Sequence, residues 1–180
     1  MTRDYRIFAG AFPEGELAEQ IQELRLKYDR VTARITPPHV TLAGTYWRVG
    51  PATAKNEAEA IRRLEILPGI LQPFELVLGG VRTFPGERPV VYLGIEINKG
   101  LIEARNLLLS MLGPDKHREF RPHLTLAMRL PWEKAWEMVN ELQASEWNTQ
   151  VHAAPINHLR LMQRGPQDKA WREIYRLSLV

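Results

Sequence analysis

The chain has 180 residues, of which 44% are hydrophobic and 25% are charged, and its net charge is +3. This length and composition suit one domain with a sizeable core, and so small a net charge points only weakly to an anionic partner. The chain contains no cysteine, which excludes disulfides, thiol nucleophiles and thiolate metal sites. No apolar run reaches the roughly 18 to 20 residues of a membrane span, and the first residues lack the apolar core of a signal peptide. We therefore expect a monomeric, cytoplasmic protein without a membrane partner.

The first half of the chain predicts alternating strands and helices. A strand is expected over 5–12, and a helix follows Pro13. The apolar stripe of that helix consists of Leu17, Ile21, Leu24 and Tyr28. A strand from His39 to Trp47 comes next, then a helix over 53–67 and a short strand over 74–78 that ends at Gly79–Gly80. The inward side of the helix over 53–67 is expected to hold Ala54, Ala58, Ile61 and Leu64 or Glu65.

The second half repeats this alternation. A loop is expected over 81–88, a strand over 89–97, and a helix over 100–112 that Asn98 caps and Gly113–Pro114 ends. A strand over 121–126 and a helix from Pro131 follow. The inward side of this last helix is expected to hold Trp132, Ala135 or Trp136, Val139 and Leu142. Strands over 147–152, 158–163 and 171–179 complete an α+β chain in which residues 1–180 form one domain.

Two of the predicted strands carry the same short sequence. Pro38-His39-Val40-Thr41-Leu42 is repeated 84 positions later as Pro122-His123-Leu124-Thr125-Leu126. Since five histidines are present, chance repetition of His-apolar-Thr-apolar is on the order of one in a thousand by composition. Residues i and i+2 of a strand share a face, so each strand is expected to present an imidazole beside a hydroxyl, with apolar residues behind.

This pair of motifs resembles the signature of the 2H phosphoesterase superfamily, two His-x-Thr-x sequences, and within it the bacterial 2′–5′ RNA ligase and cyclic phosphodiesterase group. The resemblance implies a bilobal fold of two antiparallel sheets that face each other across a cleft, with helices outside. It also implies an RNA or nucleotide substrate with a 2′,3′-cyclic phosphate, a 2′-phosphate product and reversible 2′–5′ joining.

The residues of the motifs suit that chemistry. An imidazole with a pKa near ~6.5 can act as base or acid, so one histidine can deprotonate a water while the other protonates the leaving oxygen. The hydroxyls of Thr41 and Thr125 can donate hydrogen bonds to phosphate oxygens. We expect His39, Thr41, His123 and Thr125 to be catalytic, with either histidine as the base. No metal or other cofactor is required in principle.

Substrate-binding residues are sought around the motifs. Arg118 and Arg121 precede the second motif and Arg129 follows it, so each is a candidate phosphate ligand. A solvated loop is the alternative for the basic segment over 116–121. Many members of the family carry an arginine where this chain has Met128; Arg129 either replaces that arginine or lies too far along the strand to do so. Phe8 and Phe12 on the first strand and Tyr92 on the strand over 89–97 are candidates for stacking a base, with core packing as the alternative.

Other interpretations remain open. His117, His152 and His158 are expected to be structural. A zinc site would need at least three protein ligands, and neither motif carries a carboxylate beside its histidine. The same machinery could act on cyclic phosphates of small metabolites or on 2′–5′ oligoadenylates. A nucleotide- or RNA-binding module without turnover is the alternative from another class, but it would have no use for two proton-transfer groups.

Overall fold

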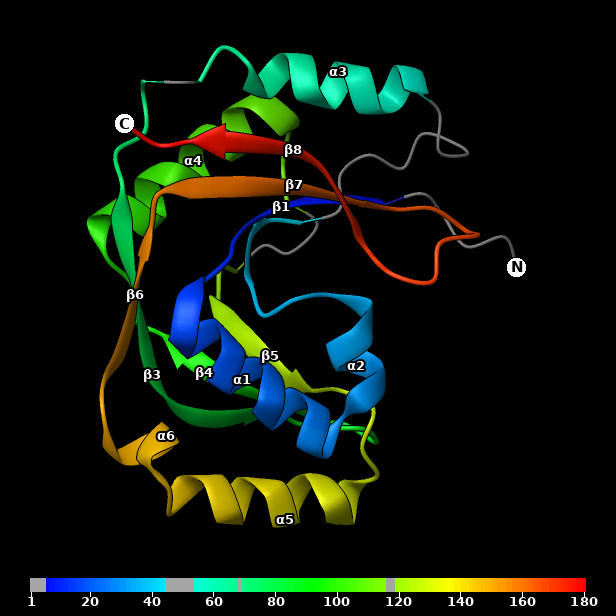
Figure 1. Cartoon of the computed structure of the whole chain (residues 1–180), viewed down its shortest axis with the longest axis vertical. Coiled ribbons are helices and arrows are strands. Elements are labelled where there is room, and N and C mark those ends of the chain that lie inside the picture. Colours follow the sequence, from blue (N-terminus) through cyan, green and yellow to red (C-terminus); the bar gives the residue numbers. More distant parts are fainter. Residues whose placement is uncertain (1–5, 45–53, 68, 116–118) are drawn as a thin grey trace.

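The computed structural model describes residues 6–44, 54–67, 69–115 and 119–180. In chain order the elements are β1 (Arg6–Ala11), α1 (Gly15–Tyr28), α2 (Arg30–Ile35), β2 (Val40–Ala43), α3 (Ala54–Leu64), β3 (Phe74–Phe84), β4 (Val90–Ile95), α4 (Lys99–Leu112), β5 (His123–Ala127), α5 (Trp132–Gln143), α6 (Glu146–Thr149), β6 (His152–Ile156), β7 (His158–Arg164) and β8 (Arg172–Ser178). The strands form a curled antiparallel sheet in the order β6-β3-β4-β5-β2-β1-β7-β8 (Figure 1). The α+β prediction is confirmed.

The two sheets implied by the family resemblance are joined into one. Strands β3 to β6 make one half of the sheet, and β1, β2, β7 and β8, from both ends of the chain, make the other. The two halves meet where the motif strands β2 and β5 pair through Val40 and Leu124. Because the chain's two motifs lie on the strands at this junction, they are neighbours in space.

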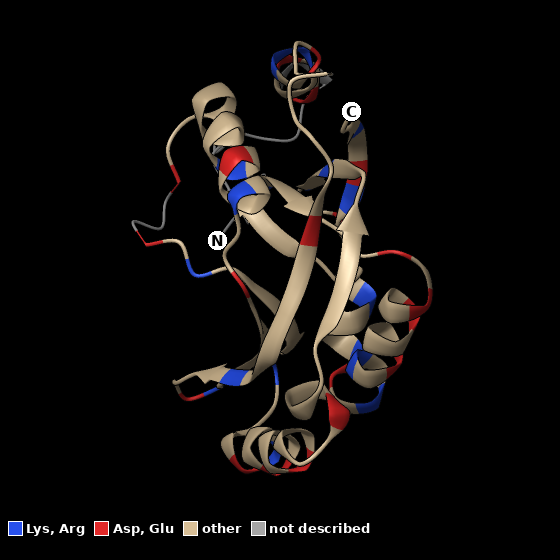
Figure 2. Cartoon of the chain, turned by 90° about the vertical axis from the view of Figure 1, so that its left-hand side faces the viewer, with Lys and Arg blue, Asp and Glu red and all other residues tan. Residues whose placement is uncertain are grey.

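Helices cover the outer faces of the sheet (Figure 1). α1 packs on β5, α4 packs on β2, and α5 and α6 pack on β3. Charged residues are concentrated on helices and connecting loops, while the long strands seen in Figure 2 carry few of them. Each motif strand thus has a helix behind it, and its other face is left for the cleft described below.

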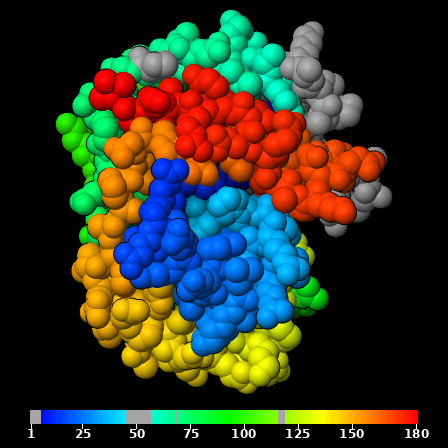
Figure 3. Space-filling model, viewed as in Figure 1, coloured from blue at the N-terminus to red at the C-terminus, as the bar shows by residue number. Residues whose placement is uncertain are grey.

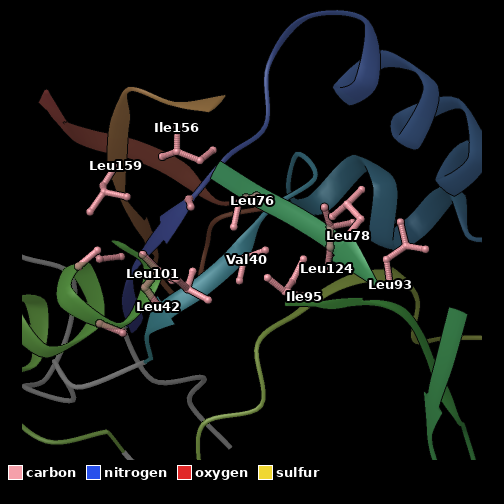
Figure 4. Packing of buried hydrophobic residues seen from close by; sticks show 14 of the residues in the cluster. Val40, Leu42, Leu76, Leu78, Leu93, Ile95, Leu101, Leu124, Ile156 and Leu159 are labelled. Carbon is pink, nitrogen blue, oxygen red and sulfur yellow. The ribbon is translucent and has the colours of Figure 1, made fainter. Parts of the chain in front are cut away.

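The core lies behind the motif strands. Val40, Leu42, Leu124 and Leu126 are fully buried, as strand alternation predicts. Figure 4 shows the core packing around these strands, among side chains of β3, β4, β7 and α4. Burying four large aliphatic side chains stabilises the fold by roughly 1.5–3 kcal/mol each. The same packing keeps the opposite, polar face of both strands turned out of the core.

Several local predictions are confirmed. Asn98 caps α4, since its side chain accepts a hydrogen bond from the Leu101 amide at 2.9 Å. Gly113 ends the same helix with a φ of 101°, a conformation that favours glycine. In the ranges described, no helix has both the length and the apolar character that crossing a bilayer requires.

The predicted end of the strand over 74–78 is wrong, and the loop expected over 81–88 is confirmed only from residue 85 onward. β3 continues to Phe84, because Gly79–Gly80 forms a bulge at which the register against β4 shifts. Gly80 has a φ of 75°, which only glycine adopts easily, and the Val81 amide donates to Asn148 Oδ1 at 3.1 Å. The glycine pair therefore bends the strand without ending it.

The strand predicted over 147–152 is also wrong at its start. Ser145 accepts a hydrogen bond from the Trp147 amide and begins the short helix α6, so β6 starts only at His152. The helix α2, whose amide of Thr32 donates to Asp29, has no counterpart among the predicted elements. Of the predicted strand from His39 to Trp47, the part beyond Gly44 lies outside the described residues.

The predicted inward sides of α3 and α5 are confirmed in part, since Leu64, Ala135, Val139 and Leu142 are buried. In α3, Ala60 and Leu64 are buried and Ala58 is exposed. In α5, the buried residues are Ala135, Met138, Val139 and Leu142. Trp132 and Trp136, expected in the core, are 55% and 39% exposed and pack on each other at 5.8 Å between ring centroids.

Candidate active site

The paired motif strands bring both histidines and both threonines to one cleft. His39, Thr41, His123 and Thr125 line a cavity of about 980 Å³. Extending the Val40–Leu124 register by one residue on each side sets His39 across from Thr125 and Thr41 across from His123. Each imidazole is therefore accompanied by a hydroxyl from its own strand and by one from the partner strand.

The two imidazoles are oriented in the same way. His39 Nδ1 lies 2.9 Å from the carbonyl oxygen of Pro37, and His123 Nδ1 lies 2.7 Å from that of Arg121. When Nδ1–H donates a hydrogen bond to the carbonyl, the lone pair of a neutral ring is on Nε2. The repeated contact therefore favours the same tautomer in both rings.

Aromatic rings hold both histidines in place. Phe8 and Phe12 stack on His39 at centroid distances of 4.8 and 5.2 Å. On the other side, Phe84 and Tyr92 meet the His123 ring edge-on at 5.0 and 5.3 Å. Such contacts restrict ring rotation, so they complement the Nδ1 hydrogen bonds.

The surroundings of His39 strongly favour its neutral form. Burial lowers the pKa of His39 to about 4, and the positive charges of Arg25 and of a protonated His123 act in the same direction. The hydrogen bond to Pro37 opposes this shift without cancelling it. At neutral pH, His39 can accept a proton but does not carry one to give away.

The cleft is basic. Among the described residues, six arginines and two carboxylates line it: Arg6, Arg25, Arg105, Arg121, Arg129, Arg164, Asp115 and Glu119. Burial lowers the pKa of Arg25 to about 10, so its guanidinium stays charged at neutral pH. An excess of cations in a partly desolvated cleft favours anionic ligands, and phosphates in particular.

Only some of the predicted substrate-binding residues line the cleft in positions where they could contact a ligand. Arg121 and Arg129 line the cleft, and Arg121 pairs with Glu119 at 2.7 Å. Arg118 lies outside the described residues. Phe8 lines the cleft but is 4% exposed and lies against His39, so little of its ring is left for a ligand. Tyr92 stacks on Phe84 at 4.3 Å and supports the His123 side.

Other residues that line the cleft were not predicted, because they belong to no sequence motif. Trp171 follows the β7–β8 turn, lies edge-on to Phe8 at 4.7 Å, and donates its backbone amide to the Ile35 carbonyl at 2.8 Å. The Arg6 guanidinium lies 5.5 Å from the centre of the Trp171 ring. Figure 3 shows the face on which α1 and α2 meet the strip of β7 and β8. Alternation from Phe8 could have found Arg6, whereas Phe84 and Trp171 depend on the sheet topology.

His152 and His158 are not among the residues that line the cleft. His152 stacks on Trp147 at 4.8 Å, and His158 Nε2 lies 3.1 Å from a carboxylate oxygen of Glu14. His117 is outside the described residues. In the part of the chain that the structure describes, no three His, Asp or Glu side chains gather as a metal site would require.

Two His-x-Thr strands at the centre of one curled antiparallel sheet match the two-histidine signature of the 2H phosphoesterase superfamily. The family model of the 2′-5′ RNA ligase superfamily matches residues 13–168, and the chain belongs to that superfamily. A curated relative in Shouchella clausii (strain KSM-K16), named "Putative phosphoesterase ABC1741", is 26% identical over 134 residues, which cover 73% of this chain and 75% of the relative.

Solved structures share the fold. The protein TT0787 of Thermus thermophilus has a TM-score of 0.65 at 21% identity, and the match covers 97% of each chain. E. coli LigT complexed with 3′-AMP has a TM-score of 0.62 at 22% identity, with 99% of each chain covered. At these identities the likeness extends to the fold alone.

Proposed function

We propose that the chain is a metal-independent phosphoesterase that opens 2′,3′-cyclic phosphates of RNA ends or nucleotides to 2′-phosphates. The observation that carries the proposal is the pair of imidazoles at one basic cleft, each tied through Nδ1 to a backbone carbonyl. Hydrolysis of a cyclic phosphate needs an activated water, a proton for the leaving oxygen and a bound phosphate. The cleft contains one group for each requirement.

The two histidines have different roles in this proposal. His39, with a pKa lowered to about 4, is neutral at pH 7 and takes the proton from the attacking water. The water oxygen bonds to phosphorus, the bond from phosphorus to the 3′ oxygen breaks, and His123 Nε2–H protonates that oxygen. The products are a 2′-phosphate and a 3′-hydroxyl. Attack by a 5′-hydroxyl in place of water, with the same break of the bond from phosphorus to the 3′ oxygen and the same protonation of that oxygen, would join two ends through a 2′–5′ linkage.

The remaining lining residues suit a nucleotide. The hydroxyls of Thr41 and Thr125 point from the same strand faces as the histidines and can donate to the non-bridging oxygens as charge builds on them. The surrounding arginines, Arg129 among them, favour the phosphate. Phe84 and Trp171 are half-buried cleft residues with the aromatic surface on which a base can stack.

The proposal is tested by measuring turnover of 2′,3′-cyclic AMP in excess EDTA. We expect hydrolysis at an unchanged rate and a single 2′-phosphate product, because protein side chains supply every proton transfer. Loss of activity upon chelation, with recovery by one divalent ion, would contradict metal independence. Tight binding of cyclic AMP without any turnover would replace the enzyme with a binding module.

The threonines should matter less than the histidines. Thr41→Val or Thr125→Val removes one hydrogen bond to phosphate and should lower kcat by roughly tenfold, a smaller effect than the loss of an acid or base. Thr41→Ser and Thr125→Ser keep the hydroxyl and should retain most of the activity. A valine variant that loses as much activity as a histidine variant would assign the hydroxyl a direct chemical role.

A further inference from the structure

Two charged side chains are buried at the end of α1. Arg25 and Asp29 are four residues apart, and they are 1% and 4% exposed. Charged side chains are almost never buried this deeply unless hydrogen-bond partners compensate them. Their partners lie on two different segments: the one that leads into β2 and the one that leaves β5.

Arg25 holds the segment before the first motif. Its Nη1 donates to the Thr36 carbonyl at 2.9 Å and to Gln22 Oε1 at 2.8 Å, and Nη2 donates to the Thr32 carbonyl at 3.3 Å. Thr36 directly precedes Pro37, whose carbonyl oxygen lies 2.9 Å from His39 Nδ1. The planar guanidinium thus fixes the peptide next to the one that orients the His39 ring.

Asp29 holds the segment after the second motif. Its Oδ1 accepts from the Thr32 amide, and its Oδ2 accepts from Thr32 Oγ1 and from the amides of Met128 and Arg129, both at 3.0 Å. Burial alone would raise the pKa of the Asp29 carboxyl, but these hydrogen bonds outweigh it, so the pKa lies below its ordinary value. The charged carboxylate therefore anchors the backbone from which Arg129 reaches the cleft.

We propose that Arg25 and Asp29 are positioning residues that set the two halves of the active site from a single helix end. Arg25 acts through the Thr36–Pro37 backbone on the tautomer and orientation of His39. Asp29 acts through the Arg129 backbone on the binding of the phosphate. The kinetic part of this inference rests on the proposed function, whereas its effects on the His39 ring and on phosphate binding do not require turnover.

The role of Arg25 in orienting His39 is tested with Arg25→Lys. An ammonium keeps the charge but cannot replace the guanidinium fork that reaches Thr36, Thr32 and Gln22 together. We expect kcat on 2′,3′-cyclic AMP to fall by roughly tenfold or more, with KM changed by less than about twofold, as a displaced catalytic group predicts. In ¹⁵N NMR spectra the His39 ring should change from the Nδ1–H tautomer to a mixture of both tautomers.

The role of Asp29 in positioning Arg129 is tested with Asp29→Asn. An amide has one acceptor oxygen in place of two, so at least one of the four donors around Asp29 loses its partner. We expect KM for 2′,3′-cyclic AMP and Kd for inorganic phosphate to rise about three- to tenfold, the cost of a misplaced phosphate ligand. The His39 tautomer should be unchanged.

The control is Ile21→Val, which weakens the same helix at a fully buried aliphatic side chain that makes no hydrogen bond to either segment. It should lower Tm without the tautomer change and without the rise in Kd.

If Arg25→Lys does not fold, Gln22→Met removes one partner of the guanidinium and should give a smaller tautomer change. An unchanged His39 tautomer in the folded variants, or kinetic effects like those of Ile21→Val, would overturn the inference. Absence of cyclic-phosphate turnover with the tautomer and phosphate effects intact would overturn the proposed function alone.

Discussion

Replacement of either His39 or His123 by alanine should lower turnover of a 2′,3′-cyclic nucleotide by roughly 10² or more. Each variant loses a proton-transfer group that no neighbour can replace, since Phe8 and Phe12 flank one ring and Phe84 and Tyr92 flank the other. The loss should appear in kcat, because proton transfer stabilises the transition state more than the bound substrate.

The measurement is steady-state hydrolysis of 2′,3′-cyclic AMP by each variant, with circular dichroism to establish that the variant is folded. His152→Ala is the matched control: this histidine packs on Trp147 and should be dispensable for turnover. If both His39→Ala and His123→Ala stay folded and keep most of their activity, the two-histidine mechanism is wrong.

The centre of the fold was predictable because it depends on local pattern. Alternation along two short strands places Val40, Leu42, Leu124 and Leu126 in the core and the histidines on the opposite face, and all four aliphatic residues are fully buried. The repetition of the motif predicts that the two strands share one site, but it does not predict that they pair, as they do at Val40 and Leu124.

The rest of the cleft was not predictable because it depends on topology. β7 pairs with β1, so Arg164 and Trp171 from the end of the chain reach the same cleft as Phe8 from its beginning. The glycine bulge in β3 extends that strand to Phe84 and so brings an aromatic ring to His123. Neither contact leaves a periodic signal in the sequence. Trp132 and Trp136 show the reverse case: their hydrophobicity predicted burial, yet both are exposed, although Ala135, Val139 and Leu142 of the same helix are buried as predicted.

The pH dependence of the rate should reveal which histidine is the base. The His39 imidazole loses its proton at about pH 4, far below the ~6.5 of a free imidazole, because burial and the nearby positive charges disfavour its charged form. If His39 is the base, kcat/KM should stay high down to about pH 4 and fall only below it. On the alkaline side the rate should fall as the acid, His123, loses its proton.

Removing one histidine should remove one side of this profile. His123→Gln should show a low rate without the alkaline fall, and His39→Gln a low rate without the acidic fall. The apparent pKa values belong to the coupled pair, so each is read from the change between variants. An acidic fall near pH ~6.5 in the unaltered protein, the value of a free imidazole, would contradict the assignment of His39 as the base. A rate that is flat from about pH 5 to 9 would contradict the role of His123 as the acid.

The lowered pKa of His39 also makes the free energy of unfolding depend on pH. The rate measurements therefore need a control for unfolding. In the unfolded chain His39 binds a proton below about pH 6.5, whereas in the folded chain it does so only below about pH 4. Between these values the unfolded state binds more protons, so the free energy of unfolding should decrease as the pH falls from about 6.5 to about 4, by at most about 3 kcal/mol from this group. Thermal unfolding must therefore be followed at each pH, and His39→Gln should lose part of this dependence. A rate that falls together with the folded fraction would reflect unfolding, whereas a fall near pH 4 in a folded protein reports protonation of the base.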